Sequence, residues 1–109
     1  MWGIRPRAPE VAFVGRERVG VIRERGYAQL APDLLAEVLS PDDRPGEVLA
    51  KVADWLAAGT KIVWVIDPER REARVYRQDG SHSVLSSDDS LDGEDVLPGF
   101  TCPLKDVLG

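Results

Sequence analysis

The sequence predicts an α+β fold, a mixed β-sheet with one flanking helix, built as a single domain over residues 1–109. Three observations predict it: two nearly all-apolar strands, an amphipathic helix between them, and an alternating strand with a hairpin turn after them. A chain of 109 residues can bury one sheet against a helix or two, but it cannot build two independent cores. No internal repeat and no linker-like stretch divides the sequence.

The first half of the chain is expected to supply an outer strand and a central one. Residues 9–15 form a short apolar stretch opened by proline and closed by glycine, which is typical of a strand. Residues 16–30 have weak periodicity and two glycines, so we expect a connecting loop there. The segment Leu34–Leu39 is apolar except for Glu37, as in a strand covered on both faces. Because a buried carboxylate without a partner is costly, Glu37 is the most informative residue of the sequence.

A helix is predicted over residues 45–58. Asp42 or Asp43 suits its N-cap, a proline falls in its first turn, and Gly59 suits its termination. The apolar residues at helical spacing are Val48, Val52, Trp55 and Leu56. This stripe predicts that the helix packs on the sheet. Lys51 falls on the stripe instead of the solvent-facing side, which is unusual for lysine.

The second half of the chain predicts the remaining strands. Residues 61–66 form another buried strand, and residues 72–77 alternate apolar with charged side chains, so one face of that strand meets water. Asp79-Gly80 marks a hairpin that returns through a further strand. The acidic stretch 86–95 is expected to be a surface loop, and residues 103–108 to form a short closing helix.

Composition limits the classes of function. The single Cys102 forms no internal disulfide and, with His82 as the only histidine, leaves no structural zinc site. No apolar run approaches the roughly 20 residues that cross a bilayer, and none resembles a secretory signal. We therefore expect a cytoplasmic protein with no membrane role. The net charge of -5 argues against bulk electrostatic binding of nucleic acid. Residues 1–30 nevertheless carry six arginines against three glutamates, a strip that either contacts phosphate or forms a solvated loop.

Several blocks of the sequence occur in a recognisable order. They are Ala31–Pro41, Lys51, Ala58-Gly59, Val63–Pro68 and Leu97–Phe100. In this order the chain resembles the Uma family of putative restriction endonucleases, from about Arg7 to Leu108. The resemblance implies a restriction-endonuclease-like core of the PD-(D/E)XK type, in which acidic residues on adjacent strands hold Mg²⁺ or Mn²⁺ and a lysine assists DNA hydrolysis. Family members begin with a further helix and strands, so we expect an amino-terminally truncated sheet with a pocket open on one side.

The resemblance also implies the site residues. Glu37 and Glu10 would bind the metal, and Lys51 would orient water or stabilise charge on the phosphate. Glu10 stands 27 positions before Glu37, where the family usually has the aspartate of a Pro-Asp pair. The broader superfamily has its lysine two residues after the strand glutamate, but that position here is Leu39, so the helix supplies Lys51. Asp33 shares a strand face with Glu37 at a distance of roughly 13 Å, which suits a supporting role.

Each of these residues also has a structural interpretation. Glu37 can pair with Lys51 inside the core, or Lys51 can extend past the apolar stripe to water. Glu10 can be an exposed residue at a strand edge, and Asp33 can simply open the strand. Two functions therefore remain open. A metal-dependent DNA endonuclease is favoured by Glu37 and Lys51, whereas a truncated, non-catalytic interaction module or homodimer is favoured by Glu10 and the acidic net charge.

Overall fold

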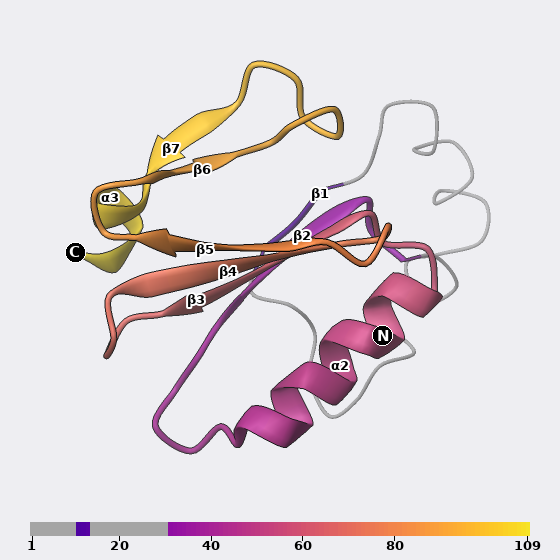
Figure 1. Cartoon of the computed structure of the whole chain (residues 1–109), viewed down its shortest axis with the longest axis horizontal. Coiled ribbons are helices and arrows are strands. Elements are labelled where there is room, and N and C mark those ends of the chain that lie inside the picture. The colour runs from indigo at the N-terminus through magenta and orange to yellow at the C-terminus, as the bar shows by residue number, and fades with distance from the viewer. Residues whose placement is uncertain (1–10, 14–30) are drawn as a thin grey trace.

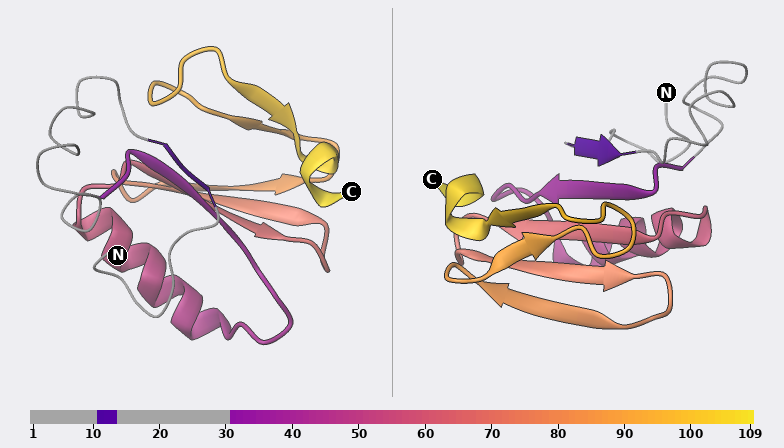
Figure 2. Two further views of the ribbon diagram at one scale, coloured as in Figure 1. Left: turned by 180° about the vertical axis from the view of Figure 1, so that it is seen from behind. Right: turned by 90° about the horizontal axis from the view of Figure 1, so that it is seen from above.

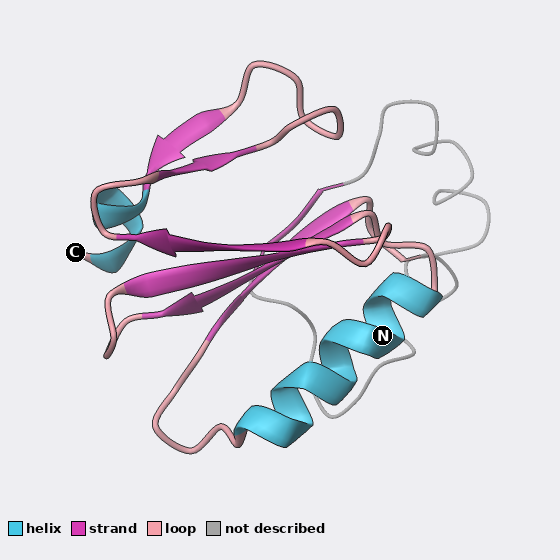
Figure 3. Ribbon diagram, viewed as in Figure 1, coloured by secondary structure: helices cyan, strands magenta, loops and turns pink. Residues whose placement is uncertain are grey.

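The computed structural model of the chain describes residues 11–13 and 31–109. Its elements are β1 (Val11–Phe13), β2 (Leu34–Val38), α2 (Pro45–Ala57), β3 (Ile62–Asp67), β4 (Glu72–Arg77), β5 (His82–Ser86), β6 (Ser90–Asp92), β7 (Thr101–Pro103) and α3 (Leu104–Leu108). Strands β1 to β5 form one mixed sheet in sequence order, in which β2 and β3 are parallel and the other neighbours antiparallel (Figure 1). The predicted α+β class with a flanking helix is confirmed (Figure 3).

The sheet separates two hydrophobic cores. Helix α2 covers one face, and the β6–β7 hairpin with α3 covers the other (Figure 2). Because successive side chains of a strand point to opposite faces, β2 and β3 contribute to both cores. The core under α2 contains Ala31, Leu35, Val52, Trp55, Val63 and Val65. The core on the opposite face contains Leu34, Ala36, Ile62, Trp64, Ile66, Ala73, Val75, Leu91 and Leu104. The expectation that β2 is buried on both faces is confirmed.

Helix α2 lies where the sequence predicts it, and hydrogen bonds around Gly59 explain why it ends there. It spans Pro45–Ala57, with Trp55 buried against the sheet. Gly59 adopts the left-handed conformation with φ 117° and donates its N–H to the carbonyl oxygen of Leu56 at 3.2 Å. The N–H of Thr60 donates to the carbonyl oxygen of Trp55 at 3.0 Å. These two hydrogen bonds form a Schellman motif, which satisfies the last carbonyls of the helix and favours glycine at its turning point.

The start of α2 differs from the prediction that Asp42 or Asp43 caps it. The N-cap residue is Arg44, in an extended conformation and without a side-chain capping hydrogen bond. Asp43 Oδ2 instead accepts hydrogen bonds from the N–H of Ser40 at 2.8 Å and from its hydroxyl at 3.2 Å. The carboxylate therefore closes the turn between β2 and α2, because an aspartate in a tight turn can satisfy backbone donors locally.

The acidic stretch 86–95, predicted as a surface loop, contains a strand, so that prediction is wrong. Strand β6 pairs with β7 in a small second sheet, and Leu91 is 3% exposed within the core. Its three residues include a single apolar side chain, which is too short a pattern for periodicity to detect. The expected helix at the end is confirmed as α3. Within the described part of the chain, no helix is long and apolar enough to cross a membrane.

A proline-glycine turn fixes the second layer onto the sheet. The N–H of Phe100 donates to the carbonyl oxygen of Leu97 at 3.1 Å, and Gly99 has φ 83°. Proline before a glycine with positive φ is the sequence that a type II turn requires. The turn places the ring of Phe100 on Trp64, with centroids 5.9 Å apart and an interplanar angle of 24°. Leu97–Phe100 therefore has a structural role on the face opposite α2.

Candidate functional site

Glu37 lies in apolar surroundings on the α2 face of the sheet. It alternates with Leu35, which packs under the helix, and its register partner on β3 is Val65 of the same core. Glu37 is only 8% exposed. The predicted burial of this carboxylate in a central strand is therefore confirmed, and its side chain points to the face that the helix covers.

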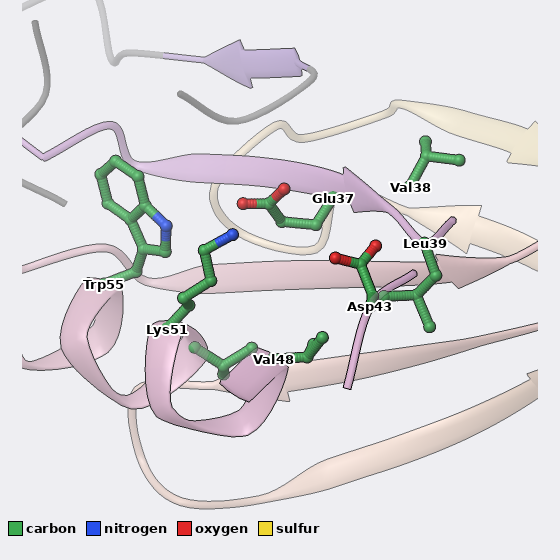
Figure 4. Close-up of a pocket in the computed structure, with 8 residues that line it drawn as sticks. Glu37, Val38, Leu39, Asp43, Val48, Lys51 and Trp55 are labelled. Atoms are coloured by element: carbon green, nitrogen blue, oxygen red, sulfur yellow. The ribbon is translucent and has the colours of Figure 1, made fainter. Parts of the chain in front are cut away.

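Lys51 reaches the same place from the middle of α2. It is half-buried, and its ammonium group points toward the carboxylate of Glu37 (Figure 4). The shared cavity is lined by Glu37, Val38, Leu39, Asp43, Val48, Lys51, Val52 and Trp55. Its volume of about 10 Å³ is room for about one water-sized occupant. Strand and helix thus bring a carboxylate and an ammonium group to one small, largely apolar cavity.

Asp43 is a member of this site that the sequence reasoning missed. It lines the cavity together with Glu37 and Lys51, and its carboxylate points in the direction of Glu37 (Figure 4). The two hydrogen bonds from Ser40 fix its orientation. The available signal was the Ser-Pro-Asp-Asp stretch directly after the strand that carries Glu37. The stretch resembles a helix start in sequence, whereas the turn that Ser40 and Asp43 form precedes the helix.

The structure does not bring Asp33 to the cavity, and it does not describe Glu10. Asp33 is 4% exposed and precedes β2, and its backbone carbonyl oxygen accepts the N–H groups of Lys61 and Ile62 at 2.9 and 3.3 Å. It is not among the residues that line the cavity. Glu10 lies outside the described residues. The supporting role of Asp33 and the metal-binding role of Glu10 remain predictions.

The donor chemistry of the cavity suits a hard divalent cation. Over residues 11–13 and 31–109, no group of three or more His, Cys, Asp or Glu side chains comes together as a metal site. The cavity does offer two carboxylates, from Glu37 and Asp43. Mg²⁺ is commonly bound by one or two carboxylates and completes its octahedral shell with water and substrate phosphate oxygens. The two carboxylates are therefore of the ligand type that Mg²⁺ accepts, while a cavity of about 10 Å³ leaves the rest of the ion's shell to lie outside it.

A larger groove continues from the cavity along the sheet. The two share Leu39, Asp43 and Val48, and the groove has a volume of about 350 Å³. Its walls come from the loop before α2, the first turns of the helix, the α2 face of β3 and β4, and the turn between these two strands. Its charged lining residues are Asp43, Asp67, Glu69, Arg70, Glu72 and Arg74. The cavity therefore adjoins a longer and larger groove.

Comparison with known protein families identifies relatives of this chain. The Uma2 family, described as a putative restriction endonuclease, matches residues 3–105 of the chain. The chain belongs to the Uma2 family. The predicted resemblance is thereby confirmed, and the match includes both Glu37 and Lys51. The comparison with curated proteins gives no match.

The Uma2 fold is also found among solved structures. The chain is similar to a protein from Anabaena variabilis ATCC 29413, described as a putative nuclease belonging to DUF820, with a TM-score of 0.65 and 29% sequence identity. The similarity covers 72% of this chain and 45% of that chain. This Uma2 chain thus spans less than half the length of the solved relative. The similarity supports the observed arrangement of a mixed sheet and a flanking helix.

Proposed function

We propose that this Uma2 protein is a metal-dependent endonuclease that hydrolyses phosphodiester bonds in DNA. The observation that carries the proposal is the cavity in which the buried carboxylate of Glu37 and the ammonium group of Lys51 face each other. Burying two ionisable side chains beside apolar walls costs stability, and side chains kept at such a cost are concentrated at functional sites. Asp43 adds a second carboxylate at the same place.

Glu37 and Glu10 are the proposed protein ligands of Mg²⁺ or Mn²⁺. When bound, the ion would supply Lewis-acid chemistry and lower the pKa of a coordinated water. The register of β1 on β2 supports this pairing, because Val11 lies opposite Ala36 in an antiparallel pair. Glu10 precedes Val11 in the sequence, and Glu37 follows Ala36.

Lys51 would hold the water or the phosphate by donating hydrogen bonds from its ammonium group. Its stem lies on the apolar stripe of α2 between Val48 and Trp55, and all three residues line the same cavity. A preorganised cation in a partly desolvated cavity stabilises developing negative charge more strongly than the same cation in water. In this role Lys51 offsets the charge that builds on the phosphate oxygens while the bond to the leaving oxygen breaks.

The two aspartates would support this centre in different ways. Asp43 is held by Ser40 and would bind a water molecule of the ion's shell or orient Lys51. Asp33 would act through the backbone, since its carbonyl oxygen holds the start of β3 beside the start of β2. Correct spacing of these two strands keeps Glu37 under the helix, because Glu37 and Val65 are register partners farther along the same pair.

The charge of the groove favours one alternative function. Its carboxylates, from Asp43, Asp67, Glu69 and Glu72, outnumber its guanidinium groups, from Arg70 and Arg74. A non-catalytic Uma2 relative could use such a surface to bind a basic segment of another protein or of a second copy of this chain. This alternative predicts no metal-dependent cleavage. A homodimer built on it would elute from a size-exclusion column at twice the monomer mass.

Cleavage of supercoiled plasmid DNA tests the proposed function. The parent should nick the plasmid with Mg²⁺ or Mn²⁺ but not with EDTA, and Glu37→Gln and Lys51→Ala should each lower the rate by about a hundredfold or more. Lys105→Ala is the matched control, because Lys105 is exposed on α3 on the opposite face of the sheet. A parent that leaves the plasmid intact at all metal concentrations, or a Glu37→Gln variant as active as the parent, would contradict the proposal.

A further inference from the structure

We propose that the groove beside the cavity guides the DNA strand, and that Arg74 binds a phosphate next to the one that is cut. This inference rests on the endonuclease function proposed above. It adds to that function a residue that neither the sequence pattern nor the family resemblance singled out. Three features of the structure lead to it: the sheet register, the loose pairing of Arg74, and the continuity of the groove with the cavity.

The register sets Arg74 in line with Glu37. Glu37 on β2 lies opposite Val65 on β3, and Val65 lies opposite Arg74 on β4. Residues that are register partners point to the same face of a sheet, and neighbouring strands are roughly 4.8 Å apart. The Cα atoms of Glu37 and Arg74 are therefore roughly 10 Å apart on the face that α2 only partly covers. A guanidinium group on its long stem can reach across much of that distance.

Arg74 is only loosely held within the protein. Its side chain is 42% exposed, and its guanidinium group meets Glu72 Oε2 at 3.5 Å, the outer limit of a hydrogen bond. Arg77, three residues later, is different: it makes three hydrogen bonds of 2.8 to 3.0 Å with both carboxylate oxygens of Glu94. Those hydrogen bonds raise the pKa of Arg77. One arginine of β4 is thus fixed by a structural partner, while the other can exchange a weak partner for a phosphate.

The groove gives that phosphate a path to the cavity. Arg74 and Val65 line it at the sheet, and Leu39, Asp43 and Val48 belong to both the groove and the cavity. A volume of about 350 Å³ lies in the range of pockets that bury a small organic ligand, a size class that includes one nucleotide unit. A strand entering along β4 would therefore pass Arg74 before its next phosphate reaches Lys51.

The guanidinium group of Arg74 can bind a phosphate even though carboxylates surround it. Arginine presents its donors as a planar fork that can bind a phosphate through two parallel hydrogen bonds. The carboxylates that line the groove repel a DNA strand, so Arg74 has to offset that repulsion locally, and Asp67 already accepts the backbone N–H of Arg70 at 3.1 Å. Binding would then depend on a few well-placed contacts and not on a broad basic surface. This agrees with the acidic net charge of the chain.

Cleavage kinetics at several salt concentrations test the inference on the full chain. The substrate is a fluorescein-labelled DNA duplex with Mg²⁺ or Mn²⁺, and the variants are Arg74→Ala, Arg74→Lys and the control Lys105→Ala. Arg74→Ala should raise KM about tenfold with little change in kcat, as for loss of a charged hydrogen bond made equally in ground and transition states. The slope of log KM against log salt should fall by about 0.9, the value for one phosphate contact. Arg74→Lys should restore the salt slope because it keeps the charge, but only part of the KM, because lysine lacks the fork of two parallel donors.

The possible outcomes distinguish failure of the Arg74 inference from failure of the proposed endonuclease function. If the parent cleaves and Arg74→Ala has the KM and the salt slope of Lys105→Ala, the inference is overturned while the endonuclease function stands. If Arg74→Ala lowers kcat at unchanged KM, Arg74 acts in the chemical step and the strand-guiding inference is wrong. If the parent does not cleave DNA, both proposals fail together. Circular dichroism of each variant checks that it is folded. Where Arg74→Ala does not fold, Arg74→Lys tests the inference, since a KM equal to that of the parent would overturn it.

Discussion

Glu37 and Lys51 enter the same cavity from consecutive elements, one from strand β2 and the other from helix α2. The connection from β2 through α2 to the parallel strand β3 explains this meeting. A helix that links two parallel neighbouring strands must cross one face of the sheet. Glu37 points to that face because it alternates with Leu34 and Ala36, which fill the opposite core. The site therefore follows from the topology and from the position of Glu37 within its strand.

A repeated turn allows the role of Asp43 to be measured against a matched control. Asp89 accepts the N–H and hydroxyl of Ser86 at 2.8 and 3.2 Å, the same distances found for Asp43 and Ser40. Asparagine at either position keeps an acceptor oxygen and removes the charge. We expect both variants to change the free energy of unfolding by less than about 1 kcal/mol in urea denaturation. Asp43→Asn should lower plasmid cleavage at least about tenfold, whereas Asp89→Asn should cleave like the parent. Equal activities would assign Asp43 to the turn alone.

Gly93 is predicted to tolerate no side chain. A Cβ built there would collide with the carbonyl oxygen and Cβ of Leu97. Leu97 cannot easily move, because its N–H donates to the carbonyl oxygen of Gly93 at 2.9 Å. We expect Gly93→Ala to destabilise the protein by about 2 kcal/mol or more. Gly46→Ala is the control: nothing lies within 4 Å of its Cβ, and alanine in a helix should stabilise by up to about 1 kcal/mol. Denaturation midpoints that shift alike for both would refute this explanation.

The ion pair between Arg77 and Glu94 is predicted to anchor the β6–β7 hairpin. Its three hydrogen bonds join the end of β4 to Glu94, a residue with φ 53° that pays a conformational cost to hold this position. A double-mutant cycle with Arg77→Ala and Glu94→Ala should give a coupling energy of about 1 kcal/mol, at the upper end of the values for exposed pairs because the contact is bidentate. Additive effects of the two substitutions would mean that the hairpin is held by its apolar contacts alone.

The stacking of Phe100 on Trp64 is predicted to contribute to stability although Phe100 is 36% exposed. Phe100→Ala removes this contact and should cost about 1 to 2 kcal/mol, from lost apolar burial and the ring interaction. Val107→Ala is a suitable comparison, since Val107 is 43% exposed and should change stability by less than about 0.5 kcal/mol. Similar losses for the two variants would show that the stacking adds nothing beyond ordinary surface packing.

Strong local patterns in the sequence were sufficient to predict the strand and helix that carry the site. The apolar run around Glu37 predicted β2, and Gly59 predicted the end of α2. Helical spacing placed Lys51 on the sheet-facing side, and alternation gave β4 its observed bounds, Glu72–Arg77. These features depend on neighbours close in sequence, which periodicity and capping rules describe well.

Features set by contacts distant in sequence could not be predicted. Strand β6 has one apolar residue, Leu91, and exists because it pairs with β7 and covers the sheet. The alignment of Arg74 with Glu37 depends on two successive strand registers, which a single sequence does not specify. The sequence does not distinguish a capping aspartate from a turn aspartate at Asp43, because the hydrogen bonds from Ser40 that decide between them are visible only in the structure.

Metal binding by Glu37 is tested most directly by thermal unfolding of the metal-free protein titrated with Mg²⁺ or Mn²⁺. An ion that binds the folded state stabilises it by about 2.7 kcal/mol at a hundred times its dissociation constant, so the Tm of the parent should rise by several degrees. Glu37→Gln should lose most of that rise, whereas Glu47→Gln, at an exposed position in the first turn of α2, should keep it. An equal rise in the parent and Glu37→Gln, or no rise in the parent, would contradict a metal site at Glu37.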